Sequence, residues 1–238
     1  MLDPAKIDVI ILCGGKGKRL KKIVKDWPKP MSVFSGKPFL THLMVYVAGF
    51  GFRRFILSTG YRGHTIEKYY QQHPASWQIE FCRETKALGT GGAVWHAKPW
   101  ISSRVFLVLN GDSFLRVGLD KFLKFHLVKK ALLSLVLVRC CGKVDSGKVL
   151  LGSRQRIIGF EEKASYKPNH FDNAGIYLMD RSVFNHMRRK ESFSLEYDFF
   201  PFFLKERCFG FVQKGRLLDF GTPDRYAYAK RHWAKGLV

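Results

Sequence analysis

Hydrophobic residues occur along the first half of the chain in short continuous runs, separated by longer amphipathic stretches. Five runs have the length and the β-branched or aromatic composition of buried strands: residues 7–13, 53–59, 77–82, 104–110 and 131–138. The stretches between them with helical spacing are residues 38–51, 62–73, 90–100 and 117–130. This alternation predicts βαβ units, and therefore an α/β fold whose parallel sheet is covered by helices on both faces.

The pattern changes after residue 138. Residues 147–163 have the alternation of a hairpin that turns at residues 152–155. The remaining expected elements are a strand at 174–180, helices near 181–187 and 195–206, and a last strand that leads into residues 217–223. Because no linker, repeat or low-complexity tract interrupts the chain, we expect one domain over residues 1–238, with a small hairpin lobe facing the substrate.

Composition excludes several classes of protein. No apolar run approaches the roughly 20 residues that a membrane-spanning helix needs, and the N-terminus does not resemble a signal peptide. The 5 cysteines are odd in number, and Cys140 and Cys141 are adjacent, which suits neither a disulfide framework nor a metal site. We therefore expect free thiols and a cytoplasmic location.

Charge is the unusual feature of the composition. The 41 Lys and Arg residues against 19 Asp and Glu give a formal net charge of +22. Nucleic acid, an anionic membrane surface and phosphorylated substrates are each possible partners, and a generally basic solvated surface is the alternative. Since the cations are scattered and no stacking motif for bases is present, we expect no nucleic-acid partner.

Polar residues follow several of the predicted strands, where ligands collect in an open parallel sheet. The segment CGGKGKR at 13–19 combines glycines with cations, as a phosphate-binding loop does, although it lacks the Walker and dinucleotide spacings. Glycines also open the helix predicted after LGTGGA at 88–93, and Asp112 and Asp219 each follow an apolar run. Either aspartate alone suits a cap or turn, but two carboxylates beside a phosphate loop favour Mg²⁺-dependent phosphoryl or nucleotidyl transfer.

Seven motifs carry a resemblance to a known family: LCGGKGKRL, WPKPM, LGTGGA, LVLNGDS, GFEEK, NAGIYL and DFGTPDRY, in this order. The chain resembles the sugar-1-phosphate nucleotidylyltransferases from about residue 7 to residue 228. It is most similar to their D-glycero-D-manno-heptose-1-phosphate guanylyltransferase branch, through KPFLTHLM, LNGDSF and FSLEYDFF. The resemblance implies a three-layer α/β/α sandwich with a Rossmann-like, mostly parallel sheet, the nucleotide-diphospho-sugar transferase fold. It also implies that a sugar 1-phosphate and an NTP react to give an NDP-sugar and pyrophosphate.

The same resemblance implies roles for individual residues. Arg19 and Lys29 would be catalytic, at the departing pyrophosphate and the reacting phosphates, and Asp112 and Asp219 would hold Mg²⁺. Nucleotide-binding residues would be Leu12, Gly14, Gly15, Gly17, Lys18, Glu84, Gly89, Thr90 and Asp112, and sugar-binding residues would be Gly147, Glu162, Lys163, Asn173 and Gly175. The chain departs from the family pattern at Lys18, where Thr is usual, and at Ser146, where Tyr is common. Neither change removes an essential charge, so an active enzyme is expected.

The choice of base depends on Glu84. A carboxylate only accepts hydrogen bonds, and guanine offers two adjacent donors, whereas cytosine or uracil offers one and adenine has no such pair. GTP is therefore favoured, with a solvated strand-end role for Glu84 as the alternative. The sugar, D-glycero-α-D-manno-heptose 1-phosphate, rests on the resemblance alone and would serve lipopolysaccharide or capsule synthesis. Mannose 1-phosphate with GTP is the second choice, glucose 1-phosphate with CTP or UTP the third, and an inactive binding relative the non-enzymatic alternative. A homo-oligomer is possible.

Overall fold

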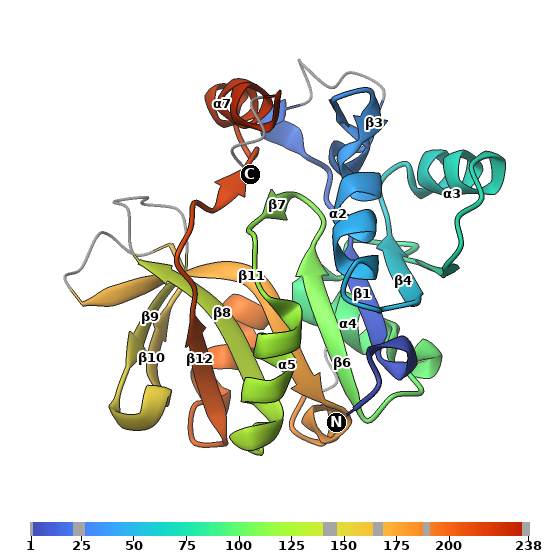
Figure 1. The fold of residues 1–238 in the computed structure, drawn as a ribbon. Helices are drawn as coiled ribbons and strands as arrows, with labels where there is room; N and C mark the ends of the chain where they lie inside the picture. Colours follow the sequence, from blue (N-terminus) through green and yellow to red (C-terminus); the bar gives the residue numbers. More distant parts are fainter. Residues whose placement is uncertain (1, 21–26, 140–146, 164–168, 188–190, 235–238) are drawn as a thin grey trace.

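The computed structural model describes residues 2–20, 27–139, 147–163, 169–187 and 191–234. A nine-stranded sheet crosses this part of the chain in the order β10-β9-β11-β6-β1-β4-β5, with β8 paired to β11 and β12 paired to β8 (Figure 1). Helices pack on both faces of the sheet. The predicted α/β class with a mostly parallel central sheet is therefore confirmed.

At one end of the sheet the strands are parallel, and they form from four of the five predicted hydrophobic runs. Its strands are β1 (Asp8–Leu12), β4 (Arg54–Thr59), β5 (Gln78–Arg83) and β6 (Val105–Asn110). Alternate side chains of β1 enter two different cores: Val9 and Ile11 pack on one face, and Ile10 packs on the other. Burial on both faces explains why β1, β4 and β6 are continuously apolar, whereas β5, at the edge of the sheet, alternates and is only partly buried.

The other end of the sheet is organised around one long strand, β11 (His170–Asp180). Its neighbours are β8 (Leu133–Arg139), β9 (Lys148–Leu151) and β6, and the sheet continues through β10 (Ile157–Glu161) and β12 (Cys208–Val212). The predicted hairpin forms and turns through η5 (Ser153–Gln155), and it extends the main sheet through β11. Sequence analysis missed β12, because Gly210 interrupts its apolar run. A Cβ at Gly210 would lie 2.4 Å from Cδ1 of Leu137, so a larger residue there would require this buried side chain to move.

A bulge divides β11 into two parts. Residues 170–172 pair with β9, whereas residues 176–180 pair with β6, and the register against β8 shifts between Asn173 and Tyr177. Gly175 lies in this irregular segment with a φ of +72°, a conformation that favours glycine. The bulge thus turns the strand exactly where it passes the carboxyl end of β6.

Different helices cover the two faces of the sheet. One face carries α2 (Phe39–Ala48), α3 (Gly63–Gln72), α5 (Leu119–Val128) and α7 (Pro223–Ala234), and the other carries α4 (Gly89–His96) and α6 (Phe200–Phe203). The helix predicted at 90–100 ends at His96 and continues as η4 (Lys98–Trp100), because Pro99 cannot donate the next helical bond. None of the helices in the described part of the chain is long and apolar enough to cross a membrane.

Two other predicted helices are shorter and less regular than expected. Residues 181–187 form only the 3₁₀ turn η6 (Arg181–Asn185), and residues 195–206 form the π-type turn η7 (Leu195–Phe199) followed by α6. The remaining short turns are η1 (Pro4–Lys6), η2 (Lys18–Leu20) and η3 (Lys29–Met31). Hydrophobic spacing alone did not distinguish η6 and η7 from α-helices.

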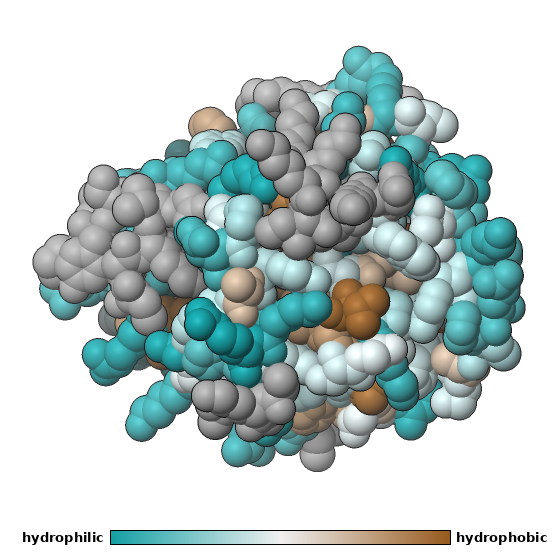
Figure 2. Space-filling model, turned by 90° about the horizontal axis from the view of Figure 1, so that it is seen from above, coloured by the Kyte–Doolittle hydropathy of each residue, from teal (hydrophilic) through white to brown (hydrophobic). Residues whose placement is uncertain are grey.

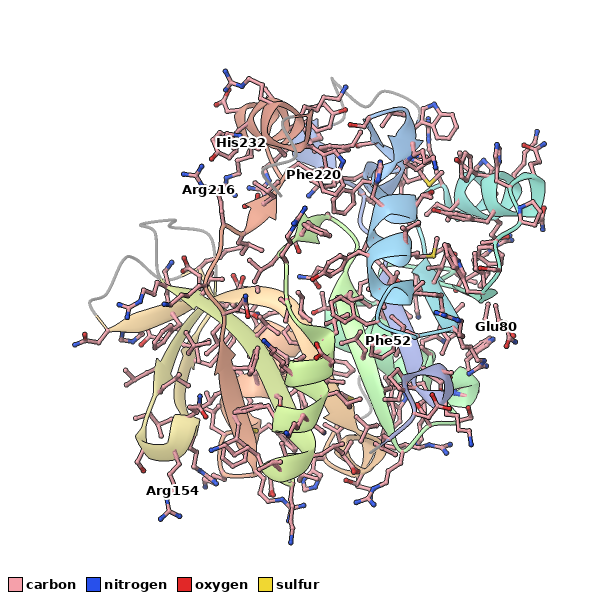
Figure 3. All side chains as sticks on the ribbon, viewed as in Figure 1. Phe52, Glu80, Arg154, Arg216, Phe220 and His232 are labelled. Carbon is pink, nitrogen blue, oxygen red and sulfur yellow. The ribbon has the colours of Figure 1, made fainter. Side chains whose placement is uncertain are left out.

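The segment that carries Asp219 belongs to a separate two-stranded ribbon. There β13 (Leu218–Asp219) runs antiparallel to β7 (Ser113–Phe114), and Asp219 lies opposite Ser113; a second ribbon joins β2 (Val33–Phe34) to β3 (Lys37–Pro38). Phe220 enters an aromatic cluster with Phe34 and Phe39, while Arg154, Arg216 and Glu80 lie at the periphery (Figure 3). This cluster holds the end of β13 against α2 and α7.

Candidate active site

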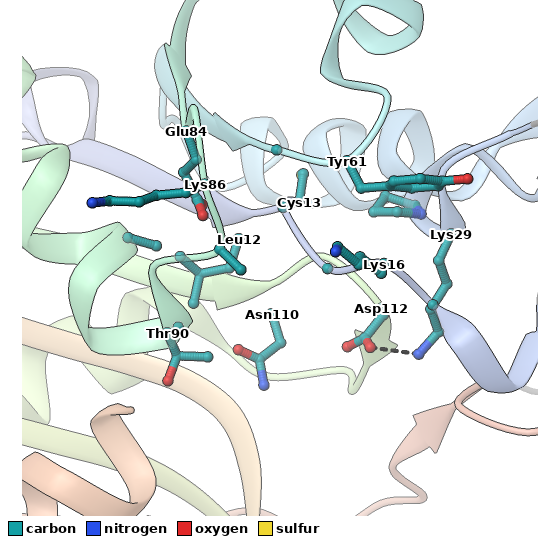
Figure 4. Close-up of a pocket in the computed structure, with 18 of the residues that line it drawn as sticks. Leu12, Cys13, Lys16, Lys29, Tyr61, Glu84, Lys86, Thr90, Asn110 and Asp112 are labelled. Atoms are coloured by element: carbon teal, nitrogen blue, oxygen red, sulfur yellow. Dashed lines mark hydrogen bonds and ion pairs between the residues drawn. The ribbon is translucent and has the colours of Figure 1, made fainter. Parts of the chain in front are cut away.

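A cavity of about 770 Å³ opens at the carboxyl ends of the parallel strands. It is lined by Leu12, Cys13, Gly14, Gly15, Lys16, Gly17, Arg19, Lys29, Pro30, Gly60, Tyr61, Glu84, Thr85, Lys86, Ala87, Gly89, Thr90, Ala93, Asn110, Asp112 and Gly221. From above, the molecule presents a mostly hydrophilic surface with a small hydrophobic area near its centre (Figure 2), and Figure 4 shows the side chains around the cavity. The structure thus brings the predicted nucleotide residues together around one cavity, except Lys18, whose side chain lies outside the described part.

Glycines shape the loop after β1. A Cβ on Gly60 would lie 2.8 Å from the carbonyl oxygen of Gly14, and the amide of Tyr61 donates to that same oxygen over 3.2 Å. Gly17 has a φ of +54°, in the left-handed region. The loop therefore follows the chain after β4 closely, while Gly15 faces open space, with no atom within 4 Å of a Cβ built there.

Glu84 is fixed beneath this loop. Its Oε1 accepts from the Ser58 hydroxyl over 2.9 Å, and its Oε2 accepts from the amide of Leu88 over 3.3 Å. A Cβ on Gly14 would lie 2.6 Å from Oε1, so only glycine permits this contact. Burial raises the pKa of Glu84, although its hydrogen bonds act in the opposite direction. Glu84 is therefore held by hydrogen bonds and is only partly exposed.

The glycines of LGTGGA allow another segment of the chain to approach closely. The carbonyl oxygen of Phe193 accepts from the amides of Gly91 and Gly92 over 3.0 and 3.1 Å, and a Cβ on Gly89 would lie 2.5 Å from that oxygen. The start of α4 thus binds the 193–196 segment of its own chain. Gly89 and Thr90 also line the cavity, while the amides of Gly91 and Gly92 are bonded to Phe193.

Two cations and two carboxylates converge at the opposite side of the cavity. The Lys29 ammonium lies 2.5 Å from Oδ2 of Asp112 (Figure 4). A Cβ on Gly221 would lie 3.5 Å from an Arg19 nitrogen, 3.6 Å from Asp219 Oδ1 and 3.8 Å from the Lys29 nitrogen. A side chain at residue 221 would therefore fill the space between these charges.

Asp112 and Asp219 were both predicted to follow strands of the parallel sheet, and for Asp219 this is wrong. Only Asp112 follows a strand of the parallel sheet, whereas Asp219 reaches the site through the antiparallel pairing of β13 with β7. Arg225 of α7 donates to Asp219 over 3.1 Å. Carboxylate oxygens are suitable ligands for Mg²⁺, but no group of three or more His, Cys, Asp or Glu side chains with metal-binding geometry occurs among the described residues.

The predicted sugar residues form a second group beside the cavity. A Cβ on Gly147 would lie 2.6 Å from Oε2 of Glu162, and the amide of Asn173 donates to the carbonyl of Gly147 over 2.9 Å. The Gly175 amide donates to Asn173 Oδ1 over 3.1 Å, while the Lys163 ammonium lies 5.6 Å from the centre of the Tyr197 ring. Ser146, the second departure from the family pattern, lies outside the described residues.

Asn110 connects the two groups, and sequence reasoning did not select it. It lines the cavity, and a Cβ on Gly175 would lie 2.4 Å from its Nδ2. Its Oδ1 is buried without a hydrogen-bond partner among the described residues. The Asn in LNGDS was the available signal, because an amide directly at a strand end is placed to contact a ligand.

No cysteine at the cavity has the properties of a nucleophile. Cys13 lines the wall, and burial raises the pKa of its thiol far above the ordinary value. Cys13, Cys82 and Cys208 are all buried and free; Cys140 and Cys141 lie outside the described residues.

The model of the nucleotidyl transferase family matches residues 8–236. The chain belongs to this family. At 33% identity over 226 residues, it resembles a D-glycero-alpha-D-manno-heptose 1-phosphate guanylyltransferase of Aneurinibacillus thermoaerophilus, covering 94% of the present chain and 97% of the relative. A protein of the same description from Campylobacter jejuni is 33% identical over 220 residues, covering 92% and 97%.

Two further proteins are similar to nearly the whole chain. A mannose-1-phosphate guanylyltransferase of Mycobacterium tuberculosis is 31% identical over 98% of this chain and 66% of its own length. The crystal structure of HddC from Yersinia pseudotuberculosis, complexed with GMP-PN, superposes with a TM-score of 0.83 at 32% identity, covering 95% of this chain and 99% of that one. The chain is thus an enzyme of the sugar-1-phosphate nucleotidyltransferase class, in which its guanylyltransferase relatives are the most prominent.

Proposed function

We propose that this enzyme transfers a guanylyl group from GTP to D-glycero-α-D-manno-heptose 1-phosphate, giving GDP-heptose and pyrophosphate. The observation that carries the proposal is the 33% identity, almost from end to end, to two enzymes of that description from different bacteria. Such a product is an activated sugar suited to lipopolysaccharide or capsule synthesis in the cytoplasm. Mannose 1-phosphate with GTP is the second candidate, supported by the mycobacterial relative.

GTP is supported by the position of Glu84. Ser58 and Leu88 occupy one acceptor site on each carboxylate oxygen, which leaves further lone pairs for the adjacent N1–H and N2–H₂ donors of guanine. In this proposal the base lies near Glu84, Gly89 and Thr90, and the triphosphate lies along the loop of Leu12, Gly14, Gly15, Gly17 and Lys18. The sugar phosphate occupies the group formed by Gly147, Glu162, Lys163, Asn173 and Gly175.

The reaction needs no side-chain nucleophile. The second pKa of a phosphate monoester is about 6, so its oxygen is already anionic at neutral pH. This oxygen attacks the α-phosphorus of GTP; one P–O bond forms, and the bond to the bridging oxygen breaks as pyrophosphate leaves. Arg19, Lys29 and Lys163 offset the repulsion between the two anions and hold them for in-line attack.

Asp112 and Asp219 are the residues that would hold Mg²⁺. Asp219 presents an oxygen beside Gly221, Asp112 is bonded to the Lys29 ammonium that also lies there, and two carboxylates with substrate phosphates suffice for this ion. When bound, Mg²⁺ supplies positive charge to the phosphate chain. Lys29 already bonds Asp112, so it can pass from the carboxylate to a phosphate oxygen when substrate arrives.

The test is pyrophosphate release over a matrix of GTP, ATP, CTP and UTP with heptose, mannose and glucose 1-phosphates. We expect the highest kcat/KM for GTP with the heptose. A preference for CTP or UTP would contradict the proposed base, and faster turnover of mannose 1-phosphate would contradict the proposed sugar. Asp112→Asn serves as the inactive control, which excludes contaminating activity.

A further inference from the structure

The motif FSLEYDFF supplies a carboxylate to which no role has been given above. Glu196 lies in η7, and its Oε2 accepts from the hydroxyl of Thr90 over 2.5 Å and from that of Ser194 over 2.7 Å. Its Oε1 accepts from the hydroxyl of Tyr177 over 3.2 Å. One carboxylate thus receives donors from a residue that lines the nucleotide cavity and from a residue of β11.

The hydrogen bonds continue from Tyr177 into the proposed sugar group. The Asn173 amide donates to the Tyr177 oxygen over 2.8 Å, and Gly175 donates to the other atom of that amide over 3.1 Å. The amide of Asn173 is therefore held in one orientation. Tyr177 itself is fully buried, and burial raises the pKa of its hydroxyl well above the ordinary value, so it remains a donor at neutral pH.

The hydrogen bonds of Thr90, on the nucleotide side, likewise fix which group donates and which accepts. The Thr90 oxygen accepts from the amide of Leu195 over 2.8 Å, so its proton is directed at Glu196. The same segment is anchored where Phe193 bonds the start of α4. Every hydroxyl around Glu196 therefore donates toward it, and only an acceptor with two oxygens satisfies all of them.

We propose that Glu196 is a positioning residue that orients Thr90 in the nucleotide cavity and, through Tyr177, Asn173 in the sugar subsite. This bridge rests on the proposed function, because it assigns the two subsites to GTP and the sugar phosphate. It explains why η7 packs against α4 and β11 at once. The carboxylate acts through these neighbours and does not contact the reacting phosphates.

The proposal predicts a pattern across three conservative variants. In Glu196→Gln, the side-chain NH₂ group faces at least one hydroxyl that donates to Glu196 in the wild type. KM should therefore rise for both GTP and heptose 1-phosphate, each by about tenfold. Tyr177→Phe removes only the sugar branch and should raise the sugar KM alone. Thr90→Val removes only the nucleotide branch and should raise the GTP KM alone.

A matched control lies in the same turn. Asp198 accepts from the amide of Ser194 over 2.8 Å and has no bond to Thr90 or Tyr177, so Asp198→Asn should change neither KM by more than about twofold. Glu196→Gln/Tyr177→Phe should bind the sugar no more weakly than Glu196→Gln alone, because both changes interrupt one chain of bonds. Thermal unfolding of each variant reports losses that arise from folding.

Steady-state pyrophosphate release with GTP and heptose 1-phosphate decides the proposal. Near wild-type KM values in Glu196→Gln, additive losses in the double variant, or equal losses in Asp198→Asn would each overturn the bridge. Failure of the proposed function has a different signature: the wild-type enzyme itself would not use this substrate pair. In that case, the same variants are compared with the NTP and sugar phosphate that the wild type prefers.

Discussion

The nucleotide side and the sugar side of this site are built in opposite ways. On the nucleotide side, a glycine loop and several cations surround a cavity, and the Lys29–Asp112 pair lies at its wall, with the Asp112 side chain 43% exposed. On the sugar side, hydrogen bonds already connect Asn173, Tyr177 and Glu196. Beneath them, Lys148 and Asp172 form an ion pair over 2.5 Å, with side chains 0% and 2% exposed.

This difference corresponds to the ligands that we propose for each side. A triphosphate brings its own charge and needs backbone amides and mobile cations, so this region is completed by the substrate. A sugar offers neutral hydroxyls whose directions must be matched, which requires acceptors and donors that are fixed beforehand. Breaking the buried ion pair on the sugar side should therefore affect stability, and removing charge on the nucleotide side should affect turnover.

The largest expected effect is on stability, at the buried ion pair. Lys148→Met leaves Asp172 without its ammonium in a site that excludes water, so the free energy of unfolding should fall by about 3–5 kcal/mol. Urea unfolding followed by circular dichroism measures this change.

The control for this prediction replaces both charges. Lys148→Met combined with Asp172→Leu removes both charges of the ion pair and should recover most of the lost stability. Equal destabilisation by the single and double variants would show that volume, and not charge, governs this position. Because Gly147 and Asn173 adjoin the pair, the double variant also reports whether sugar binding needs it.

On the nucleotide side, Asp112→Asn and Asp219→Asn should lower turnover and leave the fold intact. Each change removes a charge from the proposed metal position and should lower kcat by about a hundredfold or more, while circular dichroism stays unchanged. Pyrophosphate release as a function of Mg²⁺ concentration is the measurement. Near wild-type rates at limiting Mg²⁺ would contradict the metal role of that aspartate.

Smaller losses are expected for the two cations. Arg19→Ala and Lys29→Ala remove charge that is needed most in the transition state, so kcat should fall by about tenfold or more with little loss of stability. Lys68→Ala, at an exposed position on α3, is the matched control and should retain full activity. Similar losses at all three positions would indicate diffuse electrostatics instead of specific contacts.

The last effect concerns the base and falls on selectivity instead of the overall rate. Glu84→Gln exchanges an acceptor for a donor that faces guanine's own donors, at a cost of about 1–3 kcal/mol in selectivity for GTP. The ratio of kcat/KM for GTP to that for the other nucleotides measures this cost. An unchanged ratio would place the base elsewhere in the cavity.

Local sequence pattern determined the parallel half of the fold. The apolar runs of β1, β4 and β6 are continuous because both faces of these strands are buried, and this signal is visible within a few residues. Loop 13–19 and Asp112 could also be located, since the carboxyl ends of parallel strands share one edge of the sheet. The family motifs supplied the remaining site residues.

Only the tertiary structure decided how distant segments meet. The antiparallel pairing of β13 with β7 places Asp219 opposite Ser113, and the glycines of LGTGGA receive Phe193 from about a hundred residues further along the chain. The bridge at Glu196 likewise depends on η7 packing between α4 and β11. Hydrophobic periodicity records which face of an element is buried, but not its partner, because that choice depends on register, bulges and packing over the whole chain.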